Sequence, residues 1–494
     1  MTPQFELETL KIRLADARWA ALDLRVRVQR ALRQLILDGV LAPGLRLPAT
    51  RALAQSLGVS RDTVEQAYAQ LRLDGYLRRK TGSGSFVSPT IGASLLGKHS
   101  HGLAPVSAQP VALSVRGAQI LASGGVLDQQ SVKAFATGLP ETRAFPHDVW
   151  ERLRRQAASG HAAGVLLHGD PQGAEPLRQA IADYVNLERG ARATAGQVLV
   201  LSSTRQALYL CAQVLADAHG PILMEDPGYF GARKAFEMAQ LRVVPVPVDA
   251  QGLCTASLRA DTSGANTVYV TPSHQYPTGA TLALERRLDL VAWAAERQGW
   301  IIEDDYDSQF HYAGLPTACV QGLDARQRTI YLGTFAKSLY PGLRIGYMVL
   351  PPALVQAMTH ARSILDGHTP QLDQLTLARF IADGHFAAHV RAMRNIYALR
   401  RDAMAQAVQR HLSHIVTAHL PPGGLQMPCL LHQGRDELET IRLAAQAGIV
   451  LPGLSRLYAE APARGGWLLG FAALTPHEIG SGIARLARAL GSLH

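Results

Sequence analysis

The sequence predicts a multidomain protein in which a small, mainly helical N-terminal domain precedes a larger α/β domain that ends in a small α+β subdomain. The first observation is length, because 494 residues exceed what one hydrophobic core usually organises. The second is pattern: short helical periodicities crowd residues 21–88, whereas β-prone runs alternate with helical stretches over residues 135–494. The third is composition, because residues 89–134 are rich in Ser, Gly, Ala and Pro without periodicity, which is typical of a linker.

Bulk composition excludes several classes of protein. Hydrophobic residues make up 47% and charged residues 18% of the chain, which excludes wholesale disorder. No apolar run approaches the roughly 18 residues of a membrane-spanning helix, and the N-terminus carries acids where a signal peptide is basic. We therefore expect a cytoplasmic protein with no membrane partner. The four cysteines lack a metal-like spacing, so we expect no metal site.

Positive charge is concentrated at the N-terminal end. The formal net charge is +10, and residues 1–90 hold 14 Lys and Arg against 8 Asp and Glu, a net of +6. This asymmetry favours a polyanionic partner for the N-terminal domain.

The N-terminal domain is expected to contain a helix-turn-helix. Residues 24–37 show an amphipathic helical pattern. A second helical run covers residues 50–57, Gly58 makes the turn, and Ser60 is a natural N-cap for a third run over residues 61–75. This layout is typical of DNA-binding proteins.

Residues 76–87 (YLRRKTGSGSFV) then place two β-prone runs around a basic, glycine-rich tip, as in a wing. The helix after the turn presents its first side chains to DNA, so Arg61 is expected to reach a guanine, and Ser60 and Thr63 to reach phosphates. The other expected DNA contacts are Arg51, Arg79, Lys80, Thr81 and Gly82. A generic helical cap with exposed arginines is the alternative interpretation.

In the large domain, two segments that follow predicted strands are suited to an anion, at the sheet edge where α/β proteins bind ligands. In VLVLSSTRQALYLCAQVL, Ser203, Thr204 and Arg205 begin a helix whose free N–H groups favour a phosphate, although a plain capped helix explains them as well. In IYLGTFAKSLYPGLRIGYMVLP, Thr334 and Arg344 are placed to complete a phosphate clamp.

The same stretch carries Lys337 in a turn after an apolar strand. A lysine that forms a Schiff base needs a neutral amine in a confined site, whereas a lone lysine is usually solvated. Two aromatic side chains follow other strands: Tyr229 in MEDPGYFGARKAF and Tyr276 in VTPSHQYPTGATL. Tyr229 is placed to stack on a planar ring, with a core position as the alternative.

The run WIIEDDYDSQF ends a buried strand in acids. Because side chains alternate along a strand, Asp304 and Tyr306 are expected to share one face while Asp305 points away. A carboxylate beside a pyridine nitrogen keeps that nitrogen protonated, and a tyrosine can bond to the phenolic oxygen of the ring. Acids in an apolar strand are costly without a positive partner, which favours a functional site.

Together these segments carry two resemblances. The run LPATRALAQSLGVSRDTVEQAYAQLRLDGYLRRKTGSGSFV closely resembles the GntR-type winged helix, and residues 135–494 resemble fold-type I pyridoxal 5'-phosphate (PLP) aminotransferases. In this combination the chain resembles the MocR/GabR-type subfamily of GntR transcription regulators. The implied domains are a winged helix-turn-helix at 21–88, a linker at 89–134, and an aminotransferase-like domain for PLP binding and dimerisation at 135–494.

The resemblance implies a role for each candidate residue of the large domain. Lys337 would link PLP as an aldimine, Asp304 would pair with the pyridine nitrogen, Tyr306 with the ring oxygen, and Tyr229 would stack on the ring. The implied phosphate-binding residues are Ser203, Thr204, Arg205, Thr334 and Arg344. The implied partners are double-stranded operator DNA, a small amine or PLP itself as effector, and a second copy of the chain in a head-to-tail homodimer.

Three positions depart from the aminotransferase pattern. Ser203 replaces a usual glycine, and Tyr276, which we count among the cofactor-binding residues, replaces a usual asparagine. The strand GGWLLGFAAL lacks the substrate-carboxylate arginine often found near Leu468, and Arg464 is a candidate substitute. We therefore do not expect an ordinary α-amino acid bound as in aminotransferases.

Three functions follow as hypotheses. We favour a PLP-dependent, DNA-binding regulator in which PLP on Lys337, with or without an amine, changes the domain arrangement and operator binding. The alternative is an active PLP-dependent aminotransferase with an accessory DNA-binding domain, and the missing arginine near Leu468 counts against it. A third is a DNA-binding protein whose large domain is only a dimer scaffold, and the acid cluster counts against that.

Overall fold

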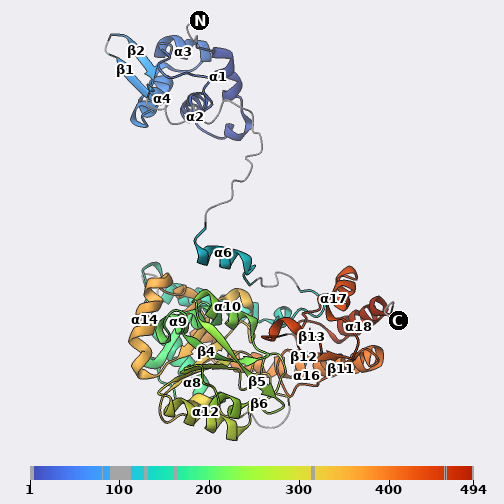
Figure 1. Cartoon of the computed structure of the whole chain (residues 1–494). Helices are drawn as coiled ribbons and strands as arrows, with labels where there is room; N and C mark the ends of the chain where they lie inside the picture. Colours follow the sequence, from blue (N-terminus) through green and yellow to red (C-terminus); the bar gives the residue numbers. More distant parts are fainter. Residues whose placement is uncertain are drawn as a thin grey trace. The chain divides into compact units, whose positions relative to one another are not determined.

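A computed structural model describes residues 5–80, 82–89, 113–126, 132–160, 164–312, 317–460, 462 and 464–491 (Figure 1). The chain divides into two compact units, Met1–Ala112 and Leu113–His494. None of the described helices combines the length and the hydropathy that crossing a membrane requires.

The N-terminal unit has the helix-turn-helix and the wing that the sequence predicts. Its elements in chain order are α1 (Leu7–Leu14), η1 (Ala17–Trp19), α2 (Leu24–Leu37), α3 (Thr50–Leu57), α4 (Arg61–Leu73), β1 (Leu77–Lys80) and β2 (Gly84–Val87). Gly58 adopts a left-handed conformation (φ 69°) between α3 and α4, which glycine reaches without strain. Ser60 caps α4 by accepting a hydrogen bond from the backbone N–H of Thr63 at 3.1 Å.

One apolar core joins these helices. Val28 and Leu32 of α2 share a buried cluster with Val64 of α4. Leu10 of α1 is fully buried in the same cluster, because α1 lies against α2. The unit thus includes a helix upstream of residue 21, where the predicted domain began.

Part of the region predicted as a linker is helical. Helix α6 (Val115–Ala122) lies within residues 89–134 and is capped by Ser114, whose hydroxyl accepts from the backbone N–H of Gly117 at 3.0 Å. Arg116 of α6 donates a hydrogen bond to Gln240. The exact domain boundaries remain predictions.

The C-terminal unit is built on one mixed β-sheet. Its strands in chain order are β3 (Val198–Leu201), β4 (Pro221–Asp226), β5 (Arg242–Asp249), β6 (Gly252–Leu253), β7 (Thr267–Val270), β8 (Trp300–Asp305), β9 (Thr329–Thr334) and β10 (Gly346–Val349). They are arranged in the order β3-β10-β9-β8-β7-β4-β5-β6. The strands β5, β4, β7, β8 and β9 run parallel, as predicted, while β10 is antiparallel to both β9 and β3.

Helices cover both faces of this sheet (Figure 1). They are α7 (His147–Gly160), α8 (Glu175–Arg189), α9 (Thr204–Leu215), α10 (Phe230–Met238), α11 (Thr255–Arg259), α12 (Leu284–Glu296), α13 (Val320–Leu323), α14 (Pro352–Asp366) and α15 (Gln371–Ala382). Val198 and Val200 of β3 belong to one buried cluster, and Leu199 and Leu201 belong to another. This alternation explains why the strand is apolar throughout, since both of its faces are covered.

A small α+β subdomain follows, as predicted. Its elements are α16 (His385–Leu412), β11 (Val416–Ala418), β12 (Gln426–Leu431), α17 (Glu437–Gln446), η6 (Ser455–Leu457), β13 (Gly466–Gly470) and α18 (Pro476–Leu490). The strands form an antiparallel sheet, and α16 packs against α18. The segment after α6 joins this subdomain, because the carbonyl of Phe135 accepts a hydrogen bond from the backbone N–H of Gly470 at 3.0 Å.

Candidate cofactor cavity and DNA-binding surface

A cavity of about 1120 Å³ lies where the parallel strands end. Segments that follow β3, β4, β7, β8 and β9 line it on one side, and the C-terminal subdomain lines the other. All of the predicted cofactor-binding residues border this one cavity: Ser203, Thr204, Arg205, Tyr229, Tyr276, Asp304, Tyr306, Thr334, Lys337 and Arg344. Parallel strands bring their carboxyl ends to one sheet edge, which is why residues 141 positions apart in sequence meet here.

The start of α9 forms one end of the cavity. Ser203 is its N-cap and accepts a hydrogen bond from the backbone N–H of Gln206 at 3.2 Å. Thr204 and Arg205, the first two residues of α9, line the cavity as well. Free N–H groups, the helix dipole and the arginine make this end suited to a phosphate group.

Asp304 is almost fully buried, with 3% of its surface exposed. Its Oδ2 accepts a hydrogen bond from the hydroxyl of Tyr269 at 2.8 Å, while its Oδ1 has no partner among the described residues. Burial raises the pKa of Asp304 to about 7, although the Tyr269 hydrogen bond opposes the shift. A buried carboxylate with an open acceptor fits a protonated ring nitrogen, which would supply the missing donor and the compensating charge.

The neighbouring acid is held differently. Oδ2 of Asp305 accepts hydrogen bonds from Arg189 and from Tyr331, each at 2.7 Å. Burial alone would raise the pKa of Asp305, but the charge of Arg189 and these hydrogen bonds hold it below its ordinary value. Asp305 therefore belongs to a buried ion pair on the other side of β8, as strand alternation predicts.

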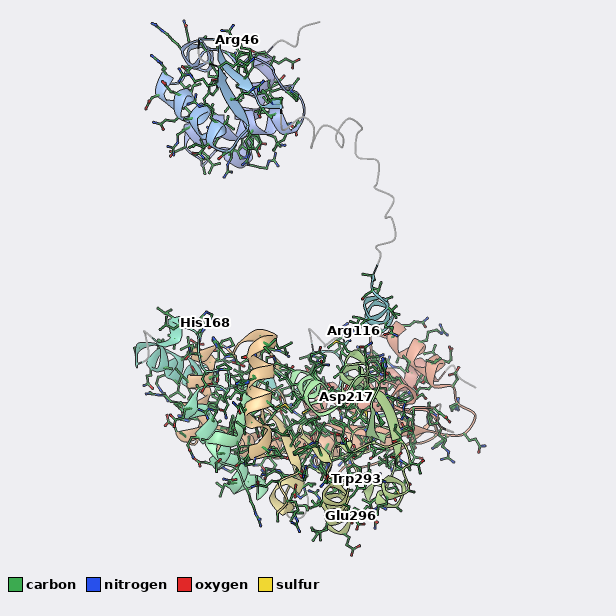
Figure 2. The ribbon with its side chains drawn as sticks, turned by 60° about the vertical axis from the view of Figure 1, so that its left-hand side comes forward. Arg46, Arg116, His168, Asp217, Trp293 and Glu296 are labelled. Carbon is green, nitrogen blue, oxygen red and sulfur yellow. The ribbon has the colours of Figure 1, made fainter. Side chains whose placement is uncertain are left out.

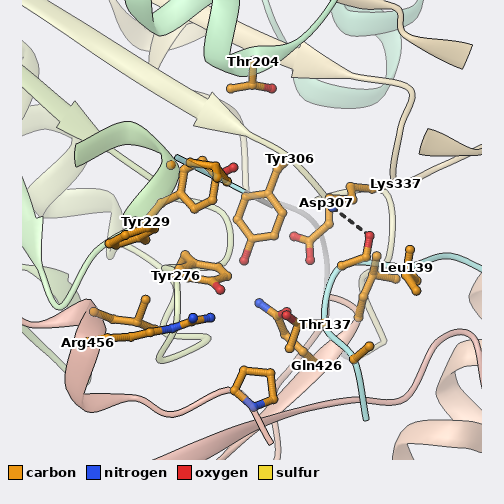
Figure 3. A pocket seen from close by; sticks show the side chains of 18 of the residues that line it. Thr137, Leu139, Thr204, Tyr229, Tyr276, Tyr306, Asp307, Lys337, Gln426 and Arg456 are labelled. Atoms are coloured by element: carbon orange, nitrogen blue, oxygen red, sulfur yellow. Dashed lines mark hydrogen bonds between the residues drawn. The ribbon is translucent and has the colours of Figure 1, made fainter. Parts of the chain in front are cut away.

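Three tyrosines line the middle of the cavity (Figure 3). The rings of Tyr229 and Tyr276 lie edge to face with centroids 5.5 Å apart, and those of Tyr276 and Tyr306 lie 6.1 Å apart. Burial raises the pKa of Tyr306 well above its ordinary value, so its hydroxyl stays a hydrogen-bond donor. That hydroxyl donates to the carbonyl of His274 at 3.0 Å.

Lys337 follows β9, and its ammonium donates a hydrogen bond to the carbonyl of Gly138 at 2.7 Å (Figure 3). A Cβ at Gly138 would lie 2.6 Å from Nζ of Lys337, and the φ of 74° also favours glycine there. Residues 136–139, which come shortly after the predicted linker, thus form the cavity wall that faces the lysine.

Several cavity residues were missed by the sequence analysis. Asp307, Gln426 and Arg456 line the cavity, and all three are labelled in Figure 3. Asp307 stood in the acidic run already singled out, whereas Gln426 and Arg456 come from a subdomain whose approach to the sheet has no local sequence signal. Arg464, the candidate substitute for a substrate-binding arginine, is exposed and is not among the described residues that border the cavity.

Leu468 explains why that arginine has no place in β13. Its side chain is 1% exposed and packs in an apolar cluster with Leu454 and Leu457. Tyr276 packs against the same cluster. An arginine near this point would have to bury its charge against those side chains.

The predicted DNA-contacting residues lie on α3, α4 and the wing of the N-terminal unit. Those that the structure describes are exposed, apart from the half-buried Thr63: Arg51, Ser60, Arg61, Arg79, Lys80 and Gly82. Thr81, which was also expected to contact DNA, lies outside the described residues. Nε of Arg61 lies 3.5 Å from Oε2 of Glu65, and the ammonium of Lys80 lies over the ring of Phe86.

Arg46 is a basic residue of this unit that the sequence analysis did not single out (Figure 2). Its backbone bridges to Phe86 of β2, and its side chain is exposed. Nε of Arg46 lies 3.4 Å from the point that a Cβ on Gly84 would occupy, so the arginine lies against the wing.

Sequence comparison relates both units to known families. Residues 24–87 match bacterial regulatory proteins of the gntR family, and residues 137–477 match aminotransferase class I and II. The chain is 36% identical over 468 residues to the probable rhizopine catabolism regulatory protein MocR of Rhizobium meliloti, covering 94% of this chain and 92% of that protein. It is 32% identical over 442 residues to the pyridoxine biosynthesis transcriptional regulator PdxR of Corynebacterium glutamicum, covering 89% and 90%.

Solved structures resemble the C-terminal unit. The α-aminoadipate aminotransferase LysN from Thermus thermophilus, complexed with N-(5'-phosphopyridoxyl)-L-leucine, is 27% identical with a TM-score of 0.70, covering 77% of this chain and 99% of that one. Kynurenine aminotransferase from Pyrococcus horikoshii is 27% identical with a TM-score of 0.68, covering 81% and 99%.

Proposed function

We propose, from the premise that this chain belongs to the MocR-type branch of the GntR transcription regulators, that its aminotransferase-like domain binds PLP at Lys337. In this proposal the bound cofactor, with or without an amine, alters how the winged helix binds operator DNA. One observation carries the proposal: Oδ1 of the buried Asp304 accepts no hydrogen bond from any described residue, and Asp304 borders the same cavity as Lys337.

The cavity offers a separate contact for each part of the cofactor. The start of α9, with Ser203, Thr204 and Arg205, would hold the phosphate together with Thr334 and Arg344. Asp304 would hold the ring nitrogen, and Tyr306 would exchange its bond to the His274 carbonyl for one to the ring oxygen. Tyr229 and Tyr276 would contact the ring. PLP supplies an aldehyde, to which the amine of Lys337 can link.

Regulation requires that the ligand bind two arrangements of the protein unequally. We propose that a second copy of the chain completes a head-to-tail homodimer, because DNA half-sites usually mirror protein symmetry. The effector would be a small amine or PLP itself, and the DNA partner accords with the expected cytoplasmic location.

An active aminotransferase is the second candidate, because Lys337, Asp304 and Tyr306 border one cavity. The buried Leu468 counts against efficient turnover of α-amino acids. Transamination at an ordinary enzymatic rate would favour this candidate over the regulator.

The deciding experiment is PLP uptake by the purified full chain, followed by borohydride reduction and peptide mapping. We expect a new visible absorption band and a reduced adduct on Lys337. Lys337→Ala should abolish the adduct and blunt the response of DNA binding to PLP, while DNA affinity itself is partly kept. Lys11→Ala, which removes a lysine paired with Glu8 on α1 of the N-terminal unit, is the control for loss of a lysine. An adduct elsewhere, or an unchanged response in Lys337→Ala, would refute the proposal.

A further inference from the structure

Asp307 is a buried acid for which the proposed cofactor contacts provide no role. It follows β8 in the turn after Tyr306 and is 1% exposed. Its Oδ1 lies 2.8 Å from Nδ1 of His274, whereas Oδ2 has no hydrogen-bond partner within the described ranges. A buried carboxylate with an open acceptor is unfavourable unless a donor or a cation joins it.

Asp307 lies at the boundary between the cofactor cavity and the C-terminal subdomain. Asp307 lines the cofactor cavity, and its carboxylate points into the cavity in Figure 3. On the side of the C-terminal subdomain, a Cβ at Gly424 would lie 2.8 Å from Oδ2, so this position accepts only a glycine beside the carboxylate. A Cβ at Gly423 would in turn lie 2.2 Å from Nε2 of His274, so glycine backbone packs against one side of the pair, and the cavity lies on another.

No lysine or arginine of the described residues bonds to Oδ2 of Asp307. Lys337, which lines the same cavity, donates its ammonium to the carbonyl of Gly138. A cationic ligand in the cavity would supply the partner that Oδ2 of Asp307 lacks.

We propose that Asp307 is the receptor for the ammonium group of a primary amine, and that the effector site accordingly selects amines that arrive as cations. An alkylammonium group carries three N–H donors and one positive charge, which match the open oxygen and the charge of the carboxylate. His274 fixes the carboxylate from the other side. This inference rests on the proposed PLP site, because the bound amine would share the cavity with Lys337.

The test compares two amines that react with the same PLP-loaded protein. Butylamine is a cation near pH 7, whereas the amino group of methoxyamine is neutral there. For each probe, the concentration for half-maximal change of the cofactor absorption band is measured in the wild type and in Asp307→Asn. We expect this concentration to rise about tenfold or more for butylamine and to change less than about twofold for methoxyamine. Equal changes for both probes, or none for butylamine, would overturn the inference.

Two further variants separate binding from folding. Asp436→Asn is the matched control, because Asp436 also lines the cavity but caps α17 by accepting from the N–H of Leu438, and asparagine caps equally well. His274→Gln keeps the carboxylate at 307 and should retain the preference for butylamine. Loss of that preference in His274→Gln, with the fold intact, would point to a structural role and refute the inference.

PLP uptake is measured first, so that failure of the proposed function is seen on its own. Should PLP fail to bind, calorimetric titration of butylammonium chloride into the wild type and Asp307→Asn still tests the carboxylate. Weaker binding to the variant would support the ammonium site, and equal binding or none would refute it.

Discussion

Asp304 and Asp305 are neighbours on β8, yet their carboxylates serve opposite faces of the sheet. Asp304 borders the cavity and keeps one oxygen without a partner among the described residues, whereas Asp305 is ion-paired with Arg189. Burial acts on both, but the pKa of Asp304 is raised to about 7 and that of Asp305 is lowered. The two acids can therefore be separated experimentally, one as a ligand contact and the other as part of the core.

Asp304→Asn should weaken PLP binding by about tenfold to a hundredfold, since it removes a charge-assisted hydrogen bond to the ring nitrogen. The dissociation constant is measured by titrating PLP against absorption or protein fluorescence. Asp436→Asn is the control for a cavity carboxylate that already has a backbone partner. An unchanged dissociation constant in Asp304→Asn would remove Asp304 from the cofactor site.

The same variant should change the pH dependence of stability in the absence of PLP. Burial raises the pKa of Asp304 from 3.8 to about 7, so the folded chain binds this proton more tightly than the unfolded chain. The ionised carboxylate therefore lowers stability increasingly as pH rises from about 4 to 7, and this cost is absent below that window. The midpoint of thermal unfolding of Asp304→Asn, compared with that of the wild type at the same pH, should therefore rise by several degrees between pH 5 and pH 8. If the unfolding midpoints of the variant and the wild type change with pH in the same way, the raised pKa of Asp304 is contradicted.

Asp305→Ala should lower the free energy of unfolding by about 3 to 5 kcal/mol, because it leaves the buried charge of Arg189 without its partner. Urea unfolding followed by tryptophan fluorescence measures this loss. Exposed Asp249, which pairs with Arg286, offers the comparison: Asp249→Ala should cost no more than about 1 kcal/mol. Similar losses in the two variants would show that the Arg189 pair contributes no more than a surface pair.

Arg61→Ala should weaken binding to a selected operator duplex by about 1 to 3 kcal/mol if Arg61 reads a base. Fluorescence anisotropy at fixed salt measures the loss on the operator and on random DNA. Arg18→Ala removes an exposed arginine of the same unit that is paired with Asp16 and lies outside the helix-turn-helix, so it should have little effect. A loss that is equal on both duplexes would mean that Arg61 contacts only phosphates.

Much of the fold was predictable from local pattern. The helices over 24–37 and 50–57 have the predicted bounds, and the predicted strands match β3, β4 and β7 to β9. The predicted fold class and family resemblance are confirmed by the matches to both families and to aminotransferase structures. The strands are predictable from apolar runs, because a parallel sheet that is covered on both faces needs apolar side chains on each face. The individual roles of the site residues remain predictions.

The missed features depend on contacts that no local pattern encodes. Alternation along β8 correctly separated Asp304 from Asp305, but the strand ends there, and the turn that carries Asp307 no longer alternates. Arg456 reaches the cavity through η6, whose position is set by Glu437: that carboxylate accepts hydrogen bonds from Ser455 and from the N–H of Gly466. Such tertiary contacts are invisible to hydrophobic periodicity.

The wall formed by Val126 and residues 136–139 has a practical consequence for dissecting the protein. An isolated effector fragment that starts at His147, the first residue of α7, would lack one wall of the cofactor cavity. The missing wall includes the carbonyl of Gly138, which accepts a hydrogen bond from the ammonium of Lys337. Fragments for expression should therefore begin upstream of α6, and the cut should fall between Val87 and Leu113. A shorter fragment would lose ligand affinity through truncation alone. That loss could be misread as evidence that ligand binding depends on the N-terminal unit.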